Sequence, residues 1–413
     1  MFRKFKTITV LIIVLAVFGF EPMTAFATGF LKTNQSVESL RVAGNQVLLA
    51  NGQAFIFEGI SVYGGLEDSD YNENLPNINA QIIAAAQFWH SNTIRLQVAE
   101  SNLFKGAKGK AAYNKAFLNE LESLVKLARS LNMAVVINDQ TEFTSNLPAP
   151  TLTTLRFWQV VGQAFKNQPY IIFDLFNEPR MDGLNLKTFI RQNQLPHTSQ
   201  QLFQQAFRYE LRSKITPVSS AQVWHIWKFG ADINGTKFIG MQQLVNQIRS
   251  SGANNLIWIE GPYWGQRLPL KPYLISGSNI VYSFHHINLN RISAWRFIGK
   301  LAAIRPVVDG EWAQYQAPWQ ECYRLAPKNT PKYLEYLHAH HIGLIAWSLQ
   351  PGSLLKGSMH IIPANNNSPT DTPNPAQLSH PSTFRSNYKC SSGFGQGSGQ
   401  LIKDYFSKYS LPL

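Results

Sequence analysis

Eight short segments rich in β-branched and other apolar residues recur along this 413-residue chain, most of them separated by helix-like stretches. Their apolar runs are nearly continuous rather than alternating, which is typical of parallel strands buried on both faces. In chain order they are Ala54–Val62, Asn92–Val98, Ala134–Asn138, Tyr170–Phe176, Asn255–Glu260, Asn279–His285, Arg305–Val308 and Ile342–Ser348. Eight strand–helix repeats in one chain predict an α/β fold of the (β/α)8 TIM-barrel type.

The connecting stretches carry the spacing expected of helices that cover such a barrel. Apolar residues three or four positions apart predict a helix over Phe117–Leu131, and shorter helices over Gly240–Ile248 and Ile292–Leu301. No G-x-G-x-x-G sequence follows any strand, which argues against an open dinucleotide-binding sheet.

Two long stretches interrupt the regular spacing, and both follow the carboxyl end of a predicted strand. Residues 180–236 follow the fourth strand and residues 351–399 follow the eighth. Active sites of barrels are built at this end, so we expect these loops to shape the site. A helix predicted at Gln400–Tyr409 closes the fold, so residues 28–413 are expected to form one domain.

The amino terminus has the pattern of an export signal. Arg3, Lys4 and Lys6 precede an apolar run from residue 10 to residue 20, and a small-x-small sequence ends at Ala27. We expect cleavage after Ala27 and a secreted, extracellular protein without stable membrane insertion. An uncleaved membrane anchor is the alternative.

Export permits a disulfide, and Cys322 and Cys390 are the only cysteines of the chain. The barrel brings their two loops to the same end, which favours a bridge. Two free thiols are the alternative.

Charge and composition exclude several classes of protein. The chain has 37 Lys and Arg, 24 Asp and Glu, a net charge of +13 and 45% hydrophobic residues, so it is not disordered. The basic residues are scattered without long runs, which argues against a nucleic-acid partner. There is no H-E-x-x-H, and His338, His340 and His341 precede the eighth strand at the opposite end of the barrel, so we expect no metal and no cofactor.

Two glutamates end predicted strands. Glu178 lies in the sequence Asn-Glu-Pro after the fourth strand, and Glu311 lies in Gly-Glu-Trp after the seventh. Glycosidic cleavage needs two carboxyl groups flanking the bond, one to protonate the leaving oxygen and one to attack the anomeric carbon or activate water. The pair therefore predicts a glycosidase.

The order and spacing of these motifs resemble glycoside hydrolase family 5, from about residue 42 to the final helix. The resemblance implies that Glu178 is the general acid/base and Glu311 the nucleophile of a retaining hydrolase. It also implies substrate contacts from Asn177 and His285, and a stacking platform at Trp347. Arg95 matches an arginine that keeps the nucleophile ionised, a role that its charge explains physically.

The sequence departs from the family pattern at two positions. Gln140 stands where the family usually has a histidine, and Ile287 stands where it usually has a tyrosine beside the nucleophile. Gln140 retains the ability to hydrogen-bond a sugar, whereas Ile287 does not.

Aromatic residues just beyond three strands are candidate sugar platforms: Tyr63, Trp264 and Trp312. Packing at the barrel rim is the alternative for each. Asp174, Glu260 and Asp309 are interpreted as structural polar residues of the barrel interior.

The leading hypothesis is a secreted, monomeric, retaining β-glycosidase that acts on a neutral β-linked glucan or mannan. The alternative is a weak or inactive family member that binds carbohydrate, a hypothesis motivated by Gln140 and Ile287.

Overall fold

The computed structural model describes a large part of the chain, with gaps. The described residues are 37–67, 71–106, 112–141, 148–180, 220–233, 236–285, 289, 292–312, 325–351, 353–357, 373–383 and 398–409. The expected signal segment and Ile287, Cys322 and Cys390 lie outside them. The disulfide therefore stays a prediction.

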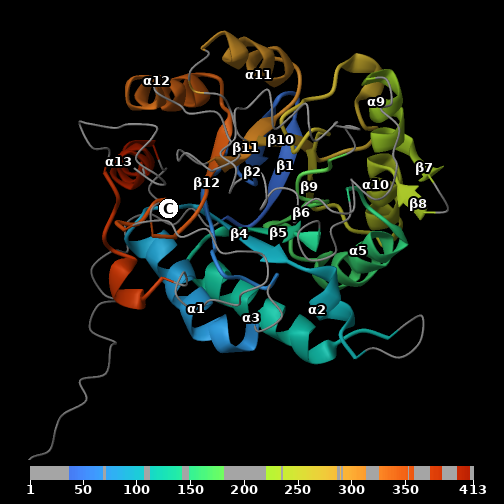
Figure 1. Cartoon of the computed structure of the whole chain (residues 1–413), viewed down its shortest axis with the longest axis horizontal. Helices are drawn as coiled ribbons and strands as arrows, with labels where there is room; N and C mark the ends of the chain where they lie inside the picture. The colour runs from blue at the N-terminus through green and yellow to red at the C-terminus, as the bar shows by residue number, and fades with distance from the viewer. Residues whose placement is uncertain are drawn as a thin grey trace, which may run out of the picture.

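Eight parallel strands close into a barrel, as the sequence predicts (Figure 1). Around the barrel they follow the order β3, β4, β5, β6, β9, β10, β11 and β12, and β12 pairs with β3. Their bounds are β3 Glu58–Ser61, β4 Thr93–Val98, β5 Ala134–Asp139, β6 Ile171–Asp174, β9 Leu256–Glu260, β10 Ile280–His285, β11 Val307–Trp312 and β12 Gly343–Ala346. Every described side chain of these strands is buried, which accounts for their continuous apolar pattern.

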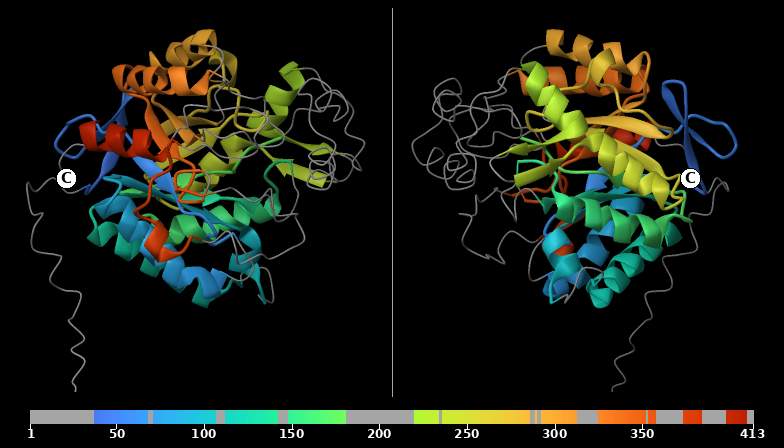
Figure 2. Two further views of the ribbon diagram at one scale, coloured as in Figure 1. Left: turned by 60° about the vertical axis from the view of Figure 1, so that its left-hand side comes forward. Right: turned by 90° about the vertical axis from the view of Figure 1, so that its right-hand side faces the viewer.

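An antiparallel hairpin lies at the amino-terminal end of the barrel (Figure 2). It consists of β1, Leu40–Ala43, and β2, Gln46–Leu49. Its apolar residues share one core cluster with Phe57, Trp258 and other side chains inside the barrel. Phe57 and Trp258 meet edge to face with ring centroids 4.8 Å apart. This end is therefore filled by packing, which leaves the carboxyl end of the strands for a site.

Helices cover the outside of the barrel and bury their apolar faces against the strands (Figure 1). The predicted helices are present with small shifts in their ends. The helices are α1 Tyr71–Gln87, α2 Glu100–Phe104, α3 Lys115–Ser130, α5 Leu152–Phe165, α9 Ser220–Phe229, α10 Met241–Ser250, α11 Trp295–Ala302, α12 Ala326–Ala339 and α13 Gly399–Tyr409. No helix within the described residues is long and apolar enough to cross a bilayer.

The described part of the insertion after β6 is ordered secondary structure. It contains α9 and a hairpin of β7, Gly230–Ile233, with β8, Thr236–Ile239. Trp227 of α9 is buried, and Trp224 stacks on Tyr273 with centroids 5.7 Å apart. These indoles anchor α9 to the barrel.

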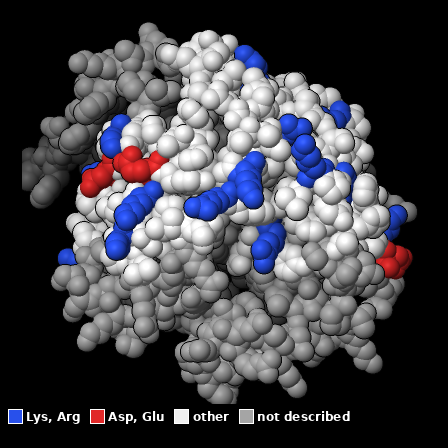
Figure 3. Space-filling model, turned by 90° about the horizontal axis from the view of Figure 1, so that it is seen from above, with Lys and Arg blue, Asp and Glu red and all other residues white. Residues whose placement is uncertain are grey.

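The chain's acids are concentrated inside the fold. Among the described residues eight carboxylates are buried, against two arginines and no lysine. The buried acids are Glu58, Glu100, Asp139, Asp174, Glu178, Glu260, Asp309 and Glu311. Basic side chains therefore dominate the visible surface in the view from above, with few acids between them (Figure 3). Burial of these carboxylates leaves the surface more positive than it would be with them exposed.

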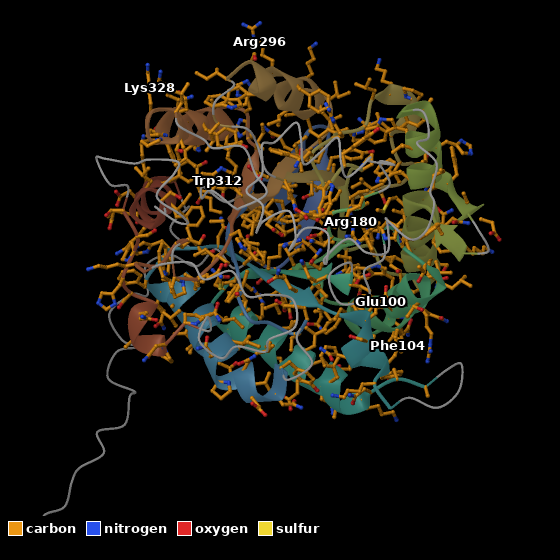
Figure 4. The ribbon with its side chains drawn as sticks, viewed as in Figure 1. Glu100, Phe104, Arg180, Arg296, Trp312 and Lys328 are labelled. Atoms are coloured by element: carbon orange, nitrogen blue, oxygen red, sulfur yellow. The ribbon has the colours of Figure 1, made fainter. Side chains whose placement is uncertain are left out.

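One buried acid lies near the carboxyl end of β5, away from the outer surface. Glu100 begins α2, and its backbone N–H donates to Thr141 Oγ1 at 3.0 Å (Figure 4). Burial raises the pKa of Glu100 to about 7, although side-chain hydrogen bonds with Thr154 and Asp139 oppose the rise.

The change Glu100→Gln should flatten the pH dependence of stability. The folded protein keeps a proton on Glu100 that the unfolded chain loses near pH 4.5, so stability falls as pH rises between about 4.5 and 7. The slope from this group is up to roughly 1.4 kcal/mol per pH unit. Urea unfolding at pH 5 and pH 7 should show that the variant gains stability relative to the parent. The exposed control Glu335→Gln should not, and equal slopes in parent and Glu100→Gln would contradict the assignment.

Candidate active site

A single buried guanidinium joins the carboxyl ends of four strands. Arg95 of β4 is fully buried, and its Nε lies 3.1 Å from Asp174 Oδ2 on β6. Its Nη1 lies 2.9 Å from Glu311 Oε2 on β11, and its Nη2 lies 3.4 Å from Glu260 Oε1 on β9. Nη2 also donates to Asn177 Oδ1 at 2.6 Å. Arg95 therefore satisfies acids from three other strands and orients Asn177.

Strand register explains why these side chains meet. Asp174 is opposite Asn138 on β5, and His285 is opposite Glu311 on the β10–β11 pair, where the register shifts by a residue. Asp309 and Glu311 are two residues apart, as same-face residues are in a strand. They nevertheless have different partners because the strand pairing is irregular between them. Asp309 accepts from the Tyr333 hydroxyl of α12 at 2.6 Å, whereas Glu311 faces Arg95.

Glu178 lies just beyond β6 in the left-handed backbone region, with φ of 44°. Its backbone N–H donates to Glu260 Oε2 at 2.7 Å. Its Oε1 lies 3.1 Å from His285 Nδ1. A non-glycine residue in this region costs of order 1–3 kcal/mol, so the surrounding contacts must hold it there.

The two glutamates face one another across His285. One carboxylate oxygen of each, together with a His285 ring nitrogen, lie within 4.8 Å of one another. Both carboxylates keep a small exposed area, with residue exposures of 4% for Glu178 and 6% for Glu311. They are the acids of this network that a bound molecule at the barrel mouth could reach.

Charge in this cluster is balanced by few cations. The Arg95 pKa is raised because the attraction of Asp174, Glu311 and Glu260 outweighs burial. The His285 pKa is also raised well above its ordinary value, since Glu260, Glu311 and Glu178 together outweigh burial. Burial and Glu260 raise the pKa of Asp174 to about 7, against the opposing effect of Arg95. Glu311, beside Arg95, is therefore placed to stay ionised.

Glu178, His285 and Glu311 are also the one group of potential metal ligands that the described residues bring together. Both ring nitrogens of His285 already face carboxylates, Nδ1 towards Glu178 and Nε2 towards Glu260 at 3.1 Å. Arg95 supplies the positive charge beside Glu311. The donors are thus engaged with one another and with Arg95.

Most of the predicted binding residues lie around this centre. Gln140 directly follows β5 and is buried, and its backbone N–H donates to the Val98 carbonyl at 2.9 Å. Trp347 follows β12, is half-buried, and meets Tyr63 edge to face at 6.3 Å. Trp264 is half-buried. The Arg180 guanidinium lies over its indole ring, with the guanidinium carbon 5.3 Å from the ring centroid.

Burial favours the packing alternative for one predicted platform. Trp312 lies within β11 and is only 1% exposed, because the strand continues past residue 308 to residue 312. Glu260 is a buried polar residue of the barrel interior, as interpreted from the sequence, and it also contacts Glu178, His285 and Arg95.

Comparison with known proteins decides the family. The family description Cellulase (glycosyl hydrolase family 5) matches residues 48–353. The chain belongs to glycoside hydrolase family 5.

Solved structures share this family 5 barrel at low sequence identity. The catalytic domain of Thermobifida fusca endoglucanase Cel5A, in complex with cellotetraose, is 14% identical over 90% of this chain and 98% of its own, with a TM-score of 0.56. A Saccharophagus degradans β-glucanase, also in complex with cellotetraose, is 16% identical over 76% of this chain and 85% of its own, with a TM-score of 0.52. At these identities the likeness shows the fold alone. No curated protein sequence matches this chain.

The change Arg95→Met should strongly destabilise this family 5 barrel. It leaves buried carboxylates without their cation, a change that costs roughly 3–5 kcal/mol in other buried pairs. Urea unfolding at pH 7 should show a loss of that size, partly recovered at pH 5 as the acids become protonated. The control Arg129→Met, which removes a partly buried arginine bonded to the Val37 carbonyl, should cost about 1 kcal/mol. Equal losses for the two variants would contradict the central role of Arg95.

Proposed function

We propose that this family 5 protein is an exported, retaining β-glycosidase that hydrolyses a neutral β-linked polysaccharide of the glucan or mannan type. The observation that carries the proposal is the short separation of Glu178 and Glu311, with oxygens within 4.8 Å. Retaining glycosidases hold their carboxyl groups about 5–5.5 Å apart, whereas inverting ones leave about 6.5–9.5 Å for a water. The cellotetraose complexes of the two structural neighbours support a β-glucan as the first substrate to test.

The proposed reaction takes two displacements. Glu178 gives its proton to the glycosidic oxygen while Glu311 attacks the anomeric carbon, so the leaving sugar departs as an alcohol and a glycosyl ester forms on Glu311. Glu178, now ionised, then removes a proton from water as the water oxygen attacks the same carbon and Glu311 leaves. The product keeps the β configuration and both glutamates return to their starting states.

Each neighbouring residue has a place in this scheme. Arg95 favours the ionised Glu311 that the first step needs. Asn177, oriented by Arg95, is the candidate contact to the sugar 2-hydroxyl, and Trp347 offers an indole face for stacking on the sugar ring. The basic, signal-like amino terminus is not required for this chemistry, and the pattern ending at Ala27 alone supports export.

Separate Glu178→Gln and Glu311→Gln variants test the proposal. On a β-glucan or mannan that the parent hydrolyses, each variant should lower the rate of sugar release by roughly 10²–10⁴-fold. Each removes a group that acts on the breaking bond. The exposed Glu335→Gln variant, which loses only the surface pair with Lys408, should keep parental activity. Undiminished activity in both site variants would show that the roles are wrong.

Proton NMR of the first product should show the β anomer before mutarotation. An initial α anomer would contradict a retaining mechanism. A parent that binds oligosaccharides in calorimetry and releases no sugar would instead support a non-catalytic carbohydrate-binding protein.

A further inference from the structure

Glu260 is a buried carboxylate that the proposed reaction does not use directly. It ends β9 and is fully buried, yet its two oxygens face different parts of the site. Oε2 accepts the backbone N–H of Glu178 at 2.7 Å, and Oε1 lies 3.1 Å from His285 Nε2. His285 Nδ1 in turn lies 3.1 Å from Glu178 Oε1. Glu260 thus reaches Glu178 twice, through its backbone and through His285.

We propose that Glu260 is a positioning residue for the acid/base Glu178, holding both its backbone and the imidazole that orients its carboxyl group. This inference rests on the proposed function of Glu178. The backbone contact opposes the cost of the left-handed conformation at φ 44°. The 3.1 Å ion-pair contact places His285 Nε2 beside Glu260 Oε1, which helps to hold the ring where it serves Glu178.

Glu260 is itself held from outside the network. The Trp227 indole N–H of α9 donates to the Glu260 carbonyl at 2.8 Å. The loop after β9 passes close by, because a Cβ on Gly265 would lie 3.2 Å from Glu260 Oε2 and 3.1 Å from the His285 ring. Gly265 also has φ of 68°, and its carbonyl accepts the His285 backbone N–H at 3.0 Å. The insertion after β6 and the loop after β9 therefore both pack against Glu260 and help to hold it in place.

A carboxylate suits this position better than an amide because of the charges that face His285. Glu178, Glu260 and Glu311 surround the ring, and Asp174 and Arg95 lie next in the network. The negative charge of Glu260 favours the doubly protonated imidazole, whose Nε2 lies beside Glu260 and whose Nδ1 lies beside Glu178. A glutamine keeps an oxygen for the Glu178 N–H and removes that charge.

The Glu260→Gln variant should therefore lose more activity on a substrate whose leaving group must be protonated than on one whose leaving group departs without a proton. For a β-linked oligosaccharide, whose leaving group must be protonated, kcat/KM should fall about 10–100-fold. For a 2,4-dinitrophenyl β-glycoside of the same sugar, whose leaving group departs without a proton, kcat/KM should fall less than about threefold in the glycosylation step. General damage to the site would lower both values alike.

Asp309→Asn is the matched control, since it also neutralises a buried acid of a barrel strand. Asp309 accepts from the Tyr333 hydroxyl of α12, so the variant should show no difference between the two substrates. A Glu260→Gln variant that lowers both substrates by the same factor, while Glu178→Gln still abolishes oligosaccharide cleavage, would overturn the inference and leave the proposed function intact.

The ¹⁵N NMR signals of His285 give a second measurement that does not depend on turnover. In the parent both ring nitrogens should have the shifts of protonated imidazole at pH 7, and in Glu260→Gln the ring should lose its proton at lower pH. Unchanged signals and an unchanged midpoint would overturn the inference. If the parent released no sugar at all, the proposed function would fail and this titration would still decide whether Glu260 controls His285.

Discussion

One buried cation determines how the carboxyl end of this barrel is organised. Arg95 meets acids from β6, β9 and β11 while its own strand passes between β3 and β5. Charges survive burial only when they are paired and hydrogen-bonded, so these strands must end at matching heights for the network to form. The barrel fixes the positions of the strands. Pairing with the Arg95 guanidinium then requires the acids Asp174, Glu260 and Glu311 to lie close together.

This pairing divides the acids of the site into different roles. Asp174 and Glu260 have no exposed side-chain surface beside Arg95, whereas Glu311 keeps a small exposed area. Glu178 faces His285, whose Nδ1 lies 3.1 Å from its Oε1. One glutamate is therefore beside a permanent cation and the other beside a titratable one, which suits a nucleophile and an acid/base respectively. The same buried acids leave basic side chains in excess over acids on the visible surface (Figure 3).

Much of this could be predicted from the sequence because it depends on patterns that repeat along the chain. Eight apolar runs indicate the barrel, a strand-end position marks Glu178 and Glu311, and the family resemblance adds Arg95 and His285. The structure brings all four together. The contacts of Glu260 could not be predicted, because a lone acid at the end of an apolar strand looks the same whether it faces the site or a structural pair. The burial of Trp312 could not be predicted because the sequence places the end of β11 four residues early. Contacts across the barrel, such as Glu260 with the Glu178 backbone, depend on register and loop geometry that local spacing does not contain.

The central claim is that Glu311 forms a covalent bond to the sugar while Glu178 handles the proton. It is tested most directly by incubating the parent with a 2-deoxy-2-fluoro β-glycoside bearing a dinitrophenyl leaving group, which slows release of the glycosyl-enzyme. Peptide mapping by mass spectrometry should then find the added sugar mass on the peptide that contains Glu311, with one equivalent bound and activity lost in parallel. Labelling of Glu178, or turnover of the reagent through an inverted product with no labelled peptide, would contradict the account.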